Sequence, residues 1–458
     1  MQLKKYSLLL ASVAGLSLLY SCQKDVSGSD SNPGTSPDST AVVNTADKEK
    51  DTTLAYSRDI YLWYNQIPDT FNARNYADPD AIMTAIRNYS NEPGFSKPVD
   101  RWSFAMKQKE WDDVSSGISG DFGLSVFFKA QGDLRVKSVE PASPAGKAGI
   151  RRGWRITTIN GDNNITTANA DAIVNNVFYS TTTSFTFQKP DNTTANITLN
   201  AATYQEHPIY LDTVYTAGAK KVGYMVFNSF LGDTTEIYNG FQRIFNRFAQ
   251  AGISDLIVDL RYNGGGYVTV QEKLADYIAP PSASGNLMMK QQYNDKYSSE
   301  NSSTNFAKRG SLNINNVFFI VSNGTASASE LLINNLKPYM NVNLVGPNNT
   351  YGKPVGFFNI PVGDWYIFPV SFRSTNKNGE GNYFNGLALN SQVADGLDKD
   401  WGDVTETCLA SALKYINTGS FRLQNVSPYV ADARVTVGNS TLDRPSFKGM
   451  IAPRKAIR

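Results

Sequence analysis

The spacing of apolar and polar residues divides the chain into three stretches with different patterns. Between residues 51 and 113 apolar positions recur at helical spacing, most clearly at 60–64 and 81–86. From residue 117 to 204, short alternating segments are separated by turn residues, which predicts a series of strands. Beyond residue 207, apolar runs typical of buried strands alternate with amphipathic helices. The pattern therefore predicts a helical, a β-rich and an α/β region, in that order.

The helical stretch is rich in aromatic residues, including Tyr56 and the run Ile60–Tyr64. Two interpretations are open for this cluster. It can form the hydrophobic core of a small helical domain, or it can line a binding groove of a surface glycan-binding lipoprotein. Aromatic side chains at helical spacing more often fill cores, so the first interpretation is favoured.

Two strand-to-helix turns in the α/β region carry small residues. The predicted strand 255–260 runs into a turn that ends in the three glycines 264–266, and the predicted strand 316–321 runs into a Ser/Ala-rich turn before a helix. Glycines leave backbone N–H groups unobstructed, so the first turn can hold an anion. No Gly-Lys-Ser/Thr follows, which disfavours a nucleotide site. The same N–H groups suit the oxyanion of an acyl-transfer intermediate.

Ser327 lies at the tip of the second turn, between Ala326 and Ala328. Taken alone, Ser327 followed by Glu330 before an apolar helix favours a capping box. The alternative is a nucleophile, because small neighbours let a substrate carbonyl approach the hydroxyl. A serine hydroxyl needs a base to remove its proton, so the choice depends on a base elsewhere in the chain.

The chain has one histidine, so the candidate bases are His207 and a lysine. His207 precedes Pro208 with no turn motif around it, which favours a structural role. Lys353 follows a Thr-Tyr-Gly sequence, and burial beside a nucleophile can lower a lysine pKa from ~10.4 towards ~7–8. By itself such a loop lysine is more often exposed.

Charge and composition exclude several classes of function. The 43 Lys and Arg residues nearly balance 41 Asp and Glu residues, giving a net charge of +2, and no long basic run is present. Nucleic-acid binding is therefore disfavoured. One histidine and two cysteines cannot supply a Cys/His zinc site or an Fe–S cluster. We expect no metal and no cofactor.

The N-terminus has the pattern of a processed leader. Lys4 and Lys5 precede an apolar run from Tyr6 to Tyr20, which is shorter than the ~20 residues that span a bilayer. The run ends in Leu-Tyr-Ser followed by Cys22, which resembles a bacterial lipoprotein signal with Cys22 as the lipidated residue. An ordinary signal peptide with an incidental cysteine is the alternative. The polar tract to about residue 48 predicts a flexible tether, and hence a lipid-anchored protein of the bacterial envelope.

Four segments in a fixed order carry a family resemblance: the strand and turn pattern of 117–204, DLRYNGG at Asp259–Gly265, GTASASE at Gly324–Glu330 and TYGK at Thr350–Lys353. Together they resemble the C-terminal processing peptidases, or tail-specific proteases. The resemblance implies a multi-domain α/β protein with a small N-terminal helical domain, a PDZ-like β-rich domain and a ClpP/crotonase-like peptidase core. It also implies a serine-type endopeptidase acting on envelope or secreted proteins, with the PDZ-like domain engaging substrate C-termini.

Carried over by position, the resemblance implies these site residues: the nucleophile Ser327, the general base Lys353, the supporting residues Glu330 and Thr350, the oxyanion-hole amides of Ala328 and of Gly264 or Gly265, and the peptide-binding residues Phe122, Gly123 and Leu124. Two positions depart from the family pattern, because Pro354 replaces the usual glycine and Phe357 stands where many members have a glutamine. A catalytically inactive peptide-binding lipoprotein with the same fold is the alternative function.

The expected organisation follows from these patterns and from the length of 458 residues, which is several times the ~150 residues of one domain. It is listed here in chain order: signal peptide 1–21, tether 22–50, helical domain 51–116, PDZ-like domain 117–204, peptidase core 205–420, and a C-terminal extension 421–458 to which the sequence assigns no role.

Overall fold

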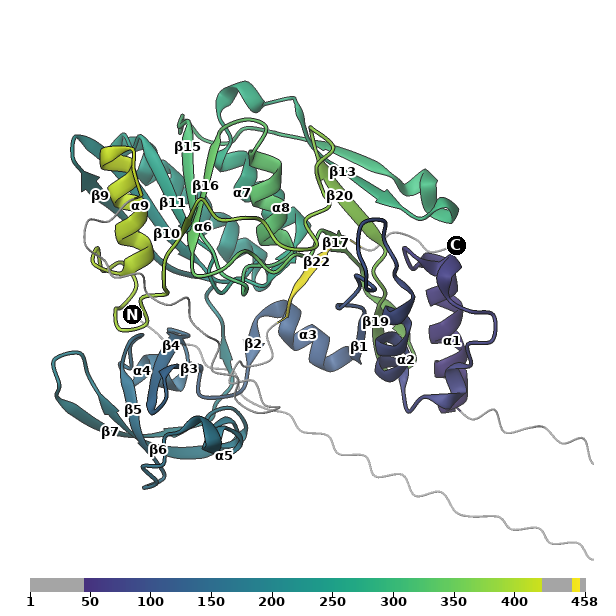
Figure 1. Ribbon diagram of the computed structural model, residues 1–458, viewed down its shortest axis with the longest axis horizontal. Helices are drawn as coiled ribbons and strands as arrows, with labels where there is room; N and C mark the ends of the chain where they lie inside the picture. Colours follow the sequence, from purple (N-terminus) through teal and green to yellow (C-terminus); the bar gives the residue numbers. More distant parts are fainter. Residues whose placement is uncertain (1–44, 422–446, 454–458) are drawn as a thin grey trace, which may run out of the picture. The chain divides into compact units, whose positions relative to one another are not determined.

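The computed structural model describes residues 45–421 and 447–453. The predicted signal peptide, the lipidation site Cys22, most of the predicted tether and much of the C-terminal extension lie outside these residues. The described chain is a mixed α/β structure whose elements follow the three predicted stretches (Figure 1). No helix within the described ranges has the length and apolarity needed to cross a bilayer.

The first region contains the helices α1 (Thr45–Ile60), α2 (Pro79–Ile86) and α3 (Gln108–Ser116), with strand β1 (Phe104–Lys107) between the last two. Helix α2 covers the predicted stretch 81–86 and begins two residues earlier, because the Asp78 side chain accepts a hydrogen bond from Ala81 N–H at 2.8 Å and Pro79 occupies the first turn. The region is not purely helical as expected. Strand β1 pairs antiparallel with β19 (Trp365–Phe368), which joins it to the later part of the chain.

The aromatic cluster of this region is hydrophobic core, as predicted. The side chains of Tyr61 and Trp63 are buried, and the Tyr61 hydroxyl donates to Asp100 at 2.8 Å. The same apolar cluster includes Phe357 and Phe368 from the later part of the chain. Tyr61 and Trp63 are therefore inside, and Tyr56, Leu62 and Tyr64 are partly buried against the same apolar cluster.

The β-rich region forms a five-stranded antiparallel sheet in the order β3-β4-β5-β6-β7, which makes β3 an edge strand. Its strands and two short helices are β3 (Leu124–Ala130), β4 (Asp133–Val139), β5 (Arg155–Ile159), β6 (Thr182–Gln188), β7 (Thr194–Asn200), α4 (Pro144–Lys147) and α5 (Ala170–Val174). Alternate residues of β3 and β4 are buried, as period-two patterning requires.

The last region is built on a six-stranded sheet in the order β21-β16-β15-β11-β10-β9, parallel except for the antiparallel β9 and β10 pair. The bounds of its strands and helices are β9 (Ile209–Ala217), β10 (Lys220–Phe227), β11 (Asp255–Asp259), β15 (Asn316–Ile320), β16 (Asn341–Gly346), β21 (Ser391–Gln392), α6 (Thr234–Ala251), α7 (Val268–Ile278), α8 (Ala328–Leu336) and α9 (Thr407–Thr418). The predicted helices and strands of this region are confirmed to within a few residues.

Both faces of this sheet are covered. On β15, Val317 and Phe319 join the core formed with α6, α7 and α8, whereas Phe318 and Ile320 join the core formed with α9. Figure 1 shows α9 on one side of the sheet and α6 to α8 on the other. Cys408 of α9 is buried among these apolar residues, as expected of an unpaired cysteine in a helix. Covered parallel strands place their carboxyl ends at one working edge.

The remaining strands form small separate sheets. They are β12 (Gly265–Tyr267), β13 (Leu287–Tyr293), β14 (Ser302–Asn305), β17 (Val355–Gly356), β18 (Ile360–Val362), β20 (Phe372–Asn376) and β22 (Gly449–Ile451), with β2 (Ile118–Ser119) pairing β8 (Tyr204–Gln205) at the entry to the β-rich region. Strand β12 pairs parallel with β22, which comes from the extension to which the sequence assigned no role.

Candidate active site

The glycine turn after β11 is fixed by the side chain of Asn263. Its amide donates to Phe227 O at 2.9 Å, and its side-chain oxygen accepts from Gly265 N–H at 2.9 Å. Gly265 has φ +104°, and a Cβ there would lie 2.9 Å from both Ala326 O and Ala328 N. Only glycine tolerates this conformation and this approach, so the turn packs directly on the serine turn.

Ser327 immediately precedes α8 and has φ +60° and ψ −108°, a conformation that L-residues other than glycine rarely adopt. Its N–H donates to Glu330 Oε2 at 2.8 Å. Its Oγ is buried and has no hydrogen-bond partner within 45–421 and 447–453. The capping-box arrangement that the motif favoured is present, but Ser327 Oγ makes no hydrogen bond in it. Strain together with a free hydroxyl is typical of a functional position.

This strain gives a stability prediction. Ser327→Gly is expected to be more stable than Ser327→Ala by about 1 kcal/mol in the free energy of unfolding, because glycine adopts a positive φ without strain and alanine does not. Its unfolding temperature should therefore be higher. The matched pair Ser329→Gly and Ser329→Ala, in the first turn of α8, should show the opposite order, since glycine is the poorer helix former. Thermal unfolding of the four variants tests this; the same order at both positions would contradict strain at Ser327.

Glu330 joins the two predicted members of the dyad. Its carboxylate is fully buried and accepts four hydrogen bonds: from Ser327 N–H and Lys353 N–H on Oε2, both at 2.8 Å, and from Thr350 Oγ1–H at 2.5 Å and Gly352 N–H at 2.7 Å on Oε1. Because both bonds to Oε2 are 2.8 Å long, the amide nitrogens of Ser327 and Lys353 lie within twice that distance of each other. Burial raises the pKa of Glu330, against the opposing effect of these donors.

Lys353 is fully buried, although its sequence context is that of an exposed loop. Burial in this apolar surrounding lowers the pKa of Lys353 well below its usual value, while Asp100 and Glu330 act in the opposite direction. The ammonium Nζ lies 3.7 Å from the ring centroid of Phe357. It donates to the Lys448 carbonyl at 2.9 Å and makes no hydrogen bond to Ser327 Oγ in the described chain.

Of the three amides expected in an oxyanion hole, two remain available. No acceptor for the N–H of Ala328 or of Gly264 is found in the described residues, whereas Gly265 N–H is already donated to Asn263. Ala328 and Gly264 flank the contact between the two turns. Ala328 follows Ser327 directly, and the glycine turn approaches Ala328 through Gly265, so these amides are candidates to stabilise a developing oxyanion.

The residues expected to hold a peptide carboxylate lie at the start of edge strand β3. Phe122 and Leu124 are buried, and Gly123 has φ +74°. Gly123 N–H donates to Asp121 Oδ1 at 2.8 Å, so this amide is not free as it stands. Phe122 is bound through its carbonyl, which accepts from Ala145 N–H at 3.0 Å.

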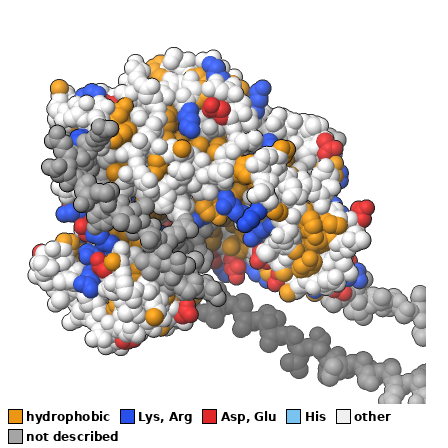
Figure 2. Space-filling view, viewed as in Figure 1, with side chains coloured by type: hydrophobic (Ala, Val, Ile, Leu, Met, Phe, Trp, Pro, Cys, Tyr) orange, Lys and Arg blue, Asp and Glu red, His pale blue; other side chains and the backbone are white. Residues whose placement is uncertain are grey.

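His207, the alternative base, lies away from this arrangement. Its ring is partly exposed, and Nδ1 lies 2.7 Å from Glu236 Oε1 at the start of α6. Nothing places it beside Ser327, which agrees with the structural role that the sequence favoured. Within 45–421 and 447–453 no group of three His, Cys, Asp or Glu side chains is positioned to hold a metal ion. On the face drawn in Figure 2, basic side chains lie in small groups among acidic and apolar ones.

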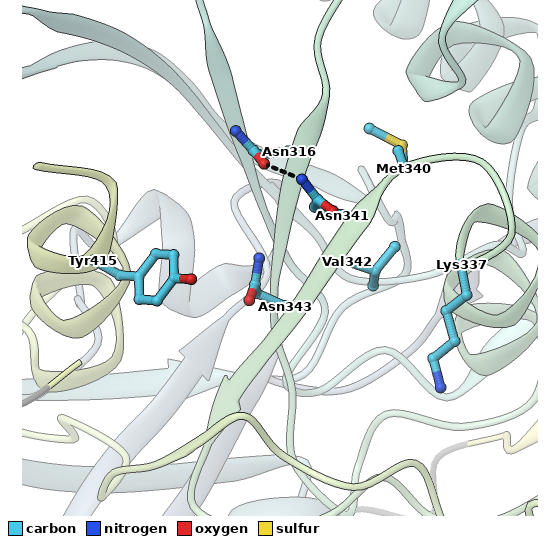
Figure 3. A pocket seen from close by; sticks show the side chains of 7 residues that line it. All are labelled: Asn316, Lys337, Met340, Asn341, Val342, Asn343 and Tyr415. Atoms are coloured by element: carbon cyan, nitrogen blue, oxygen red, sulfur yellow. Dashed lines mark hydrogen bonds between the residues drawn. The ribbon is translucent and has the colours of Figure 1, made fainter. Parts of the chain in front are cut away.

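A polar pocket of about 490 Å³ lies at the opposite end of the sheet (Figure 3). It is lined by Asn316 and Asn341, which are hydrogen bonded at 2.9 Å, and by Lys337 and Tyr415. Asn316 and Asn341 begin β15 and β16, whereas Ser327 follows the carboxyl end of β15. The pocket is therefore separate from the candidate site.

Sequence reasoning missed three contributors to this site: Asn263, Asp100 and the Lys448 carbonyl. Asn263 stands within the glycine motif and had a detectable signal, since Asn often organises tight turns through its side chain. Asp100 and Lys448 carry no local signal, because they reach the site from 253 positions before and 95 positions after Lys353.

Comparison with known proteins shows similarity first in the fold and then in the sequence. The chain is similar to a crystal structure of an S41 protease from Bacteroides fragilis NCTC 9343, with a TM-score of 0.66 and 23% sequence identity over 81% of this chain and 97% of that one. This likeness defines a multi-domain α/β fold of the S41 protease type.

The sequence matches fall in two parts of the chain. Residues 221–389 match Peptidase family S41, and residues 54–104 match the Peptidase S41 N-terminal domain. These two parts are therefore similar to the S41 peptidases, the group that includes the C-terminal processing type that the motifs resembled.

Among the curated relatives, the chain is 26% identical over 265 residues to a CtpA-like serine protease of Staphylococcus aureus strain N315, covering 56% of this chain and 49% of that protein. The match to the CtpA-like serine protease of Staphylococcus saprophyticus is also 26%, over 264 residues. The chain spans about half the length of the curated relatives it matches.

Proposed function

We propose that this protein is a serine-type endopeptidase in which Ser327 is the nucleophile and Lys353 the general base. The observation that carries the proposal is the shared carboxylate oxygen Glu330 Oε2, which accepts from the backbone N–H of both residues at 2.8 Å. A strained serine with a free hydroxyl is thereby held close to a buried lysine. The match of residues 221–389 to Peptidase family S41 supports protein or peptide substrates.

The reaction would use only groups of the chain and water. Neutral Lys353 leaves the Lys448 carbonyl and accepts the Ser327 proton while Oγ bonds to the peptide carbonyl carbon. The N–H groups of Ala328 and Gly264 stabilise the oxyanion. The C–N bond then breaks, the amine leaves with the proton held by Lys353, and water hydrolyses the acyl-enzyme. Thr350 and Glu330 position the dyad without touching the substrate.

We also propose that residues 117–204 are a PDZ-like module that binds the C-terminal end of substrates. The support is the position of Phe122, Gly123 and Leu124 at the start of an edge strand, where an extended peptide can add to the sheet. Since Gly123 N–H is held by Asp121, a bound carboxylate would have to displace that side chain or use neighbouring amides.

The module contacts the peptidase core through a buried arginine. Arg152 donates to Asp395 at 2.5 Å and to the Tyr262 hydroxyl at 3.0 Å. Tyr262 lies one residue before the Asn263 that fixes the glycine turn. We propose in addition that the domains span residues 51–116, 117–204 and 205–420. We also propose that a lipid on Cys22 anchors the protein in the bacterial envelope.

The proposal is tested by cleavage of an unstructured protein by the purified chain and by Ser327→Ala, measured from pH 5 to 10. The base must be neutral, so the rate should rise with pH through the pKa of Lys353. Because burial lowers that pKa, the plateau should begin well below the ~10.4 of a free lysine. Equal cleavage by both chains would eliminate Ser327 as nucleophile. Absence of cleavage by either chain, and also by a chain that ends at residue 421, would favour the inactive peptide-binding alternative.

A further inference from the structure

A short segment from the C-terminal extension lies across the candidate active site. Strand β22 runs parallel to β12, with Gly265 opposite Gly449 and Tyr267 opposite Ile451, and Gly449 N–H donates to Gly264 O at 3.0 Å. Strand β12 is the continuation of the glycine turn. In Figure 1 the segment is drawn in yellow, next to β17. The segment therefore pairs with the backbone that carries the oxyanion-hole candidate Gly264.

The other edge of the segment is also paired. Phe357 N–H donates to Met450 O at 3.0 Å, and Ala452 N–H donates to Phe357 O at 3.1 Å. The segment is thus bonded through its backbone on both sides, between β12 and the residue that follows β17. Backbone pairing of this kind is how an extended peptide binds when it adds a strand to a sheet.

Side chains of the segment fill apolar sites on this surface. Met450 is completely buried, and the Phe447 ring packs edge-on against Trp111 and Phe357 at centroid distances of 5.3 and 6.1 Å. A Cβ on Gly449 would lie 1.9 Å from the Phe447 ring, so glycine is required at that position when the ring occupies this site. The surface therefore selects side chains as well as backbone.

The segment also contacts the catalytic candidates directly. The Lys448 carbonyl accepts the hydrogen bond of Lys353 Nζ at 2.9 Å, which engages the amine that should face Ser327. A Cβ at Gly264 would lie 2.1 Å from Phe447 O, so the segment passes close over the glycine turn. With the segment in place, Ser327 and Lys353 are both completely buried. The segment thus occupies the surface beside both catalytic candidates.

We propose that residues 447–453 are an intramolecular occupant of the substrate cleft, bound as an extended substrate is bound and inhibiting cleavage in trans. This inference rests on the proposed peptidase function and adds the binding mode: an extended peptide, parallel to β12, with an aromatic residue two positions before a glycine and apolar residues after it. Since the segment belongs to the same chain, its effective concentration at the cleft is high, on the order of mM.

The test compares the full chain with a chain ending at residue 421 and with full-length Met450→Glu, which keeps the tail but places a charge in its apolar site. Both altered chains should cleave an unstructured protein about tenfold faster or more. Full-length Pro453→Ala is the matched control, because Pro453 is exposed at the end of the segment, and its rate should equal that of the unaltered chain.

Binding is measured separately with a labelled peptide of sequence FKGMIAP, residues 447–453. It should bind the shortened Ser327→Ala chain in fluorescence anisotropy and raise the KM of the shortened active chain without changing kcat. A peptide with Phe447→Ala should bind at least about tenfold more weakly, since it lacks the aromatic anchor. If thermal unfolding shows that the shortened chain does not fold, the cleavage rate and the binding of the labelled peptide are measured instead on full-length Met450→Glu and full-length Phe447→Ala.

The outcomes separate this inference from the proposed function. Cleavage at the unaltered rate by folded Met450→Glu and shortened chains, with no peptide binding, would overturn the inference and leave the peptidase intact. Peptide binding by Ser327→Ala with no cleavage by any chain would support the occupied cleft and reject the peptidase. Faster cleavage that the peptide suppresses competitively supports both.

Discussion

Replacing Lys353 with methionine is expected to abolish cleavage and, at neutral pH, to make the fold more stable. Methionine fills a similar volume but cannot accept the Ser327 proton, so the rate should fall at least about 10³-fold. Removing a fully buried amine that has one hydrogen bond also removes a desolvation penalty. We expect a gain of about 1–2 kcal/mol, seen as a higher unfolding temperature.

The sign of the pH dependence follows from the lowered pKa. Between the folded-state pKa of Lys353 and the ~10.4 of the unfolded chain, only the unfolded state binds the proton, so stability is lost as pH falls through this window. Lys353→Met has no amine at this position, so its stability does not fall with pH in this way. The stability difference between the variant and the unaltered chain should therefore be small at pH 10.5 and grow towards neutral pH.

The control for this experiment is Lys337→Met. Burial also lowers the pKa of Lys337, but this side chain lines the pocket at the opposite end of the sheet. Its replacement should leave the cleavage rate unchanged. Loss of stability in Lys353→Met at pH 7, or retention of its activity, would show that Lys353 has a structural role and is not the base.

Glu330→Gln is expected to be the most damaging conservative substitution at the site. Each carboxylate oxygen accepts two hydrogen bonds, and on Oε2 both donors are backbone N–H groups. An amide would turn one of the two oxygens into an NH₂ donor that faces at least one N–H donor inside a buried space. Losing such charge-assisted bonds should cost about 3 kcal/mol or more of stability.

The same substitution should lower the cleavage rate about 10²-fold, because Ser327 and Lys353 would lose the oxygen that holds them together. The control is Glu272→Gln in α7. Burial also raises the pKa of Glu272, but that carboxylate has one side-chain bond, from Thr304 at 3.3 Å, which an amide oxygen can accept. Chemical unfolding and cleavage measured for both variants test this prediction. Equal stability losses would show that burial alone sets the cost.

Local patterns predicted elements well where neighbours in the sequence decide the structure. Helix α6 is one of the amphipathic helices expected beyond residue 207, and the structure shows it capped by Asp233 and ended by Gly252 in the left-handed conformation. The serine turn lies between strand and helix as its sequence predicts. Strand β1 was missed, because it is a short edge segment whose pairing partner β19 lies some 260 residues later.

The candidate site could be predicted only in its residue types. The sequence motifs singled out Ser327, Glu330 and Lys353, but the serine motif alone favoured a helix cap. Against a role as cap alone stand the missing hydrogen bond of Ser327 Oγ and the positive φ of Ser327, at a place where the glycine turn packs on the neighbouring Ala326 and Ala328.

By itself, the sequence determined the order of strands and helices, the two small-residue turns at the carboxyl ends of β11 and β15, and the residues that chemistry would need. Only the tertiary structure decided that Lys353 is buried and that residues 447–453 lie against the glycine turn. The physical reason is that helix caps, turns and periodicity are short-range properties. The pKa of a lysine and the occupant of a cleft depend instead on which distant segments exclude water from it.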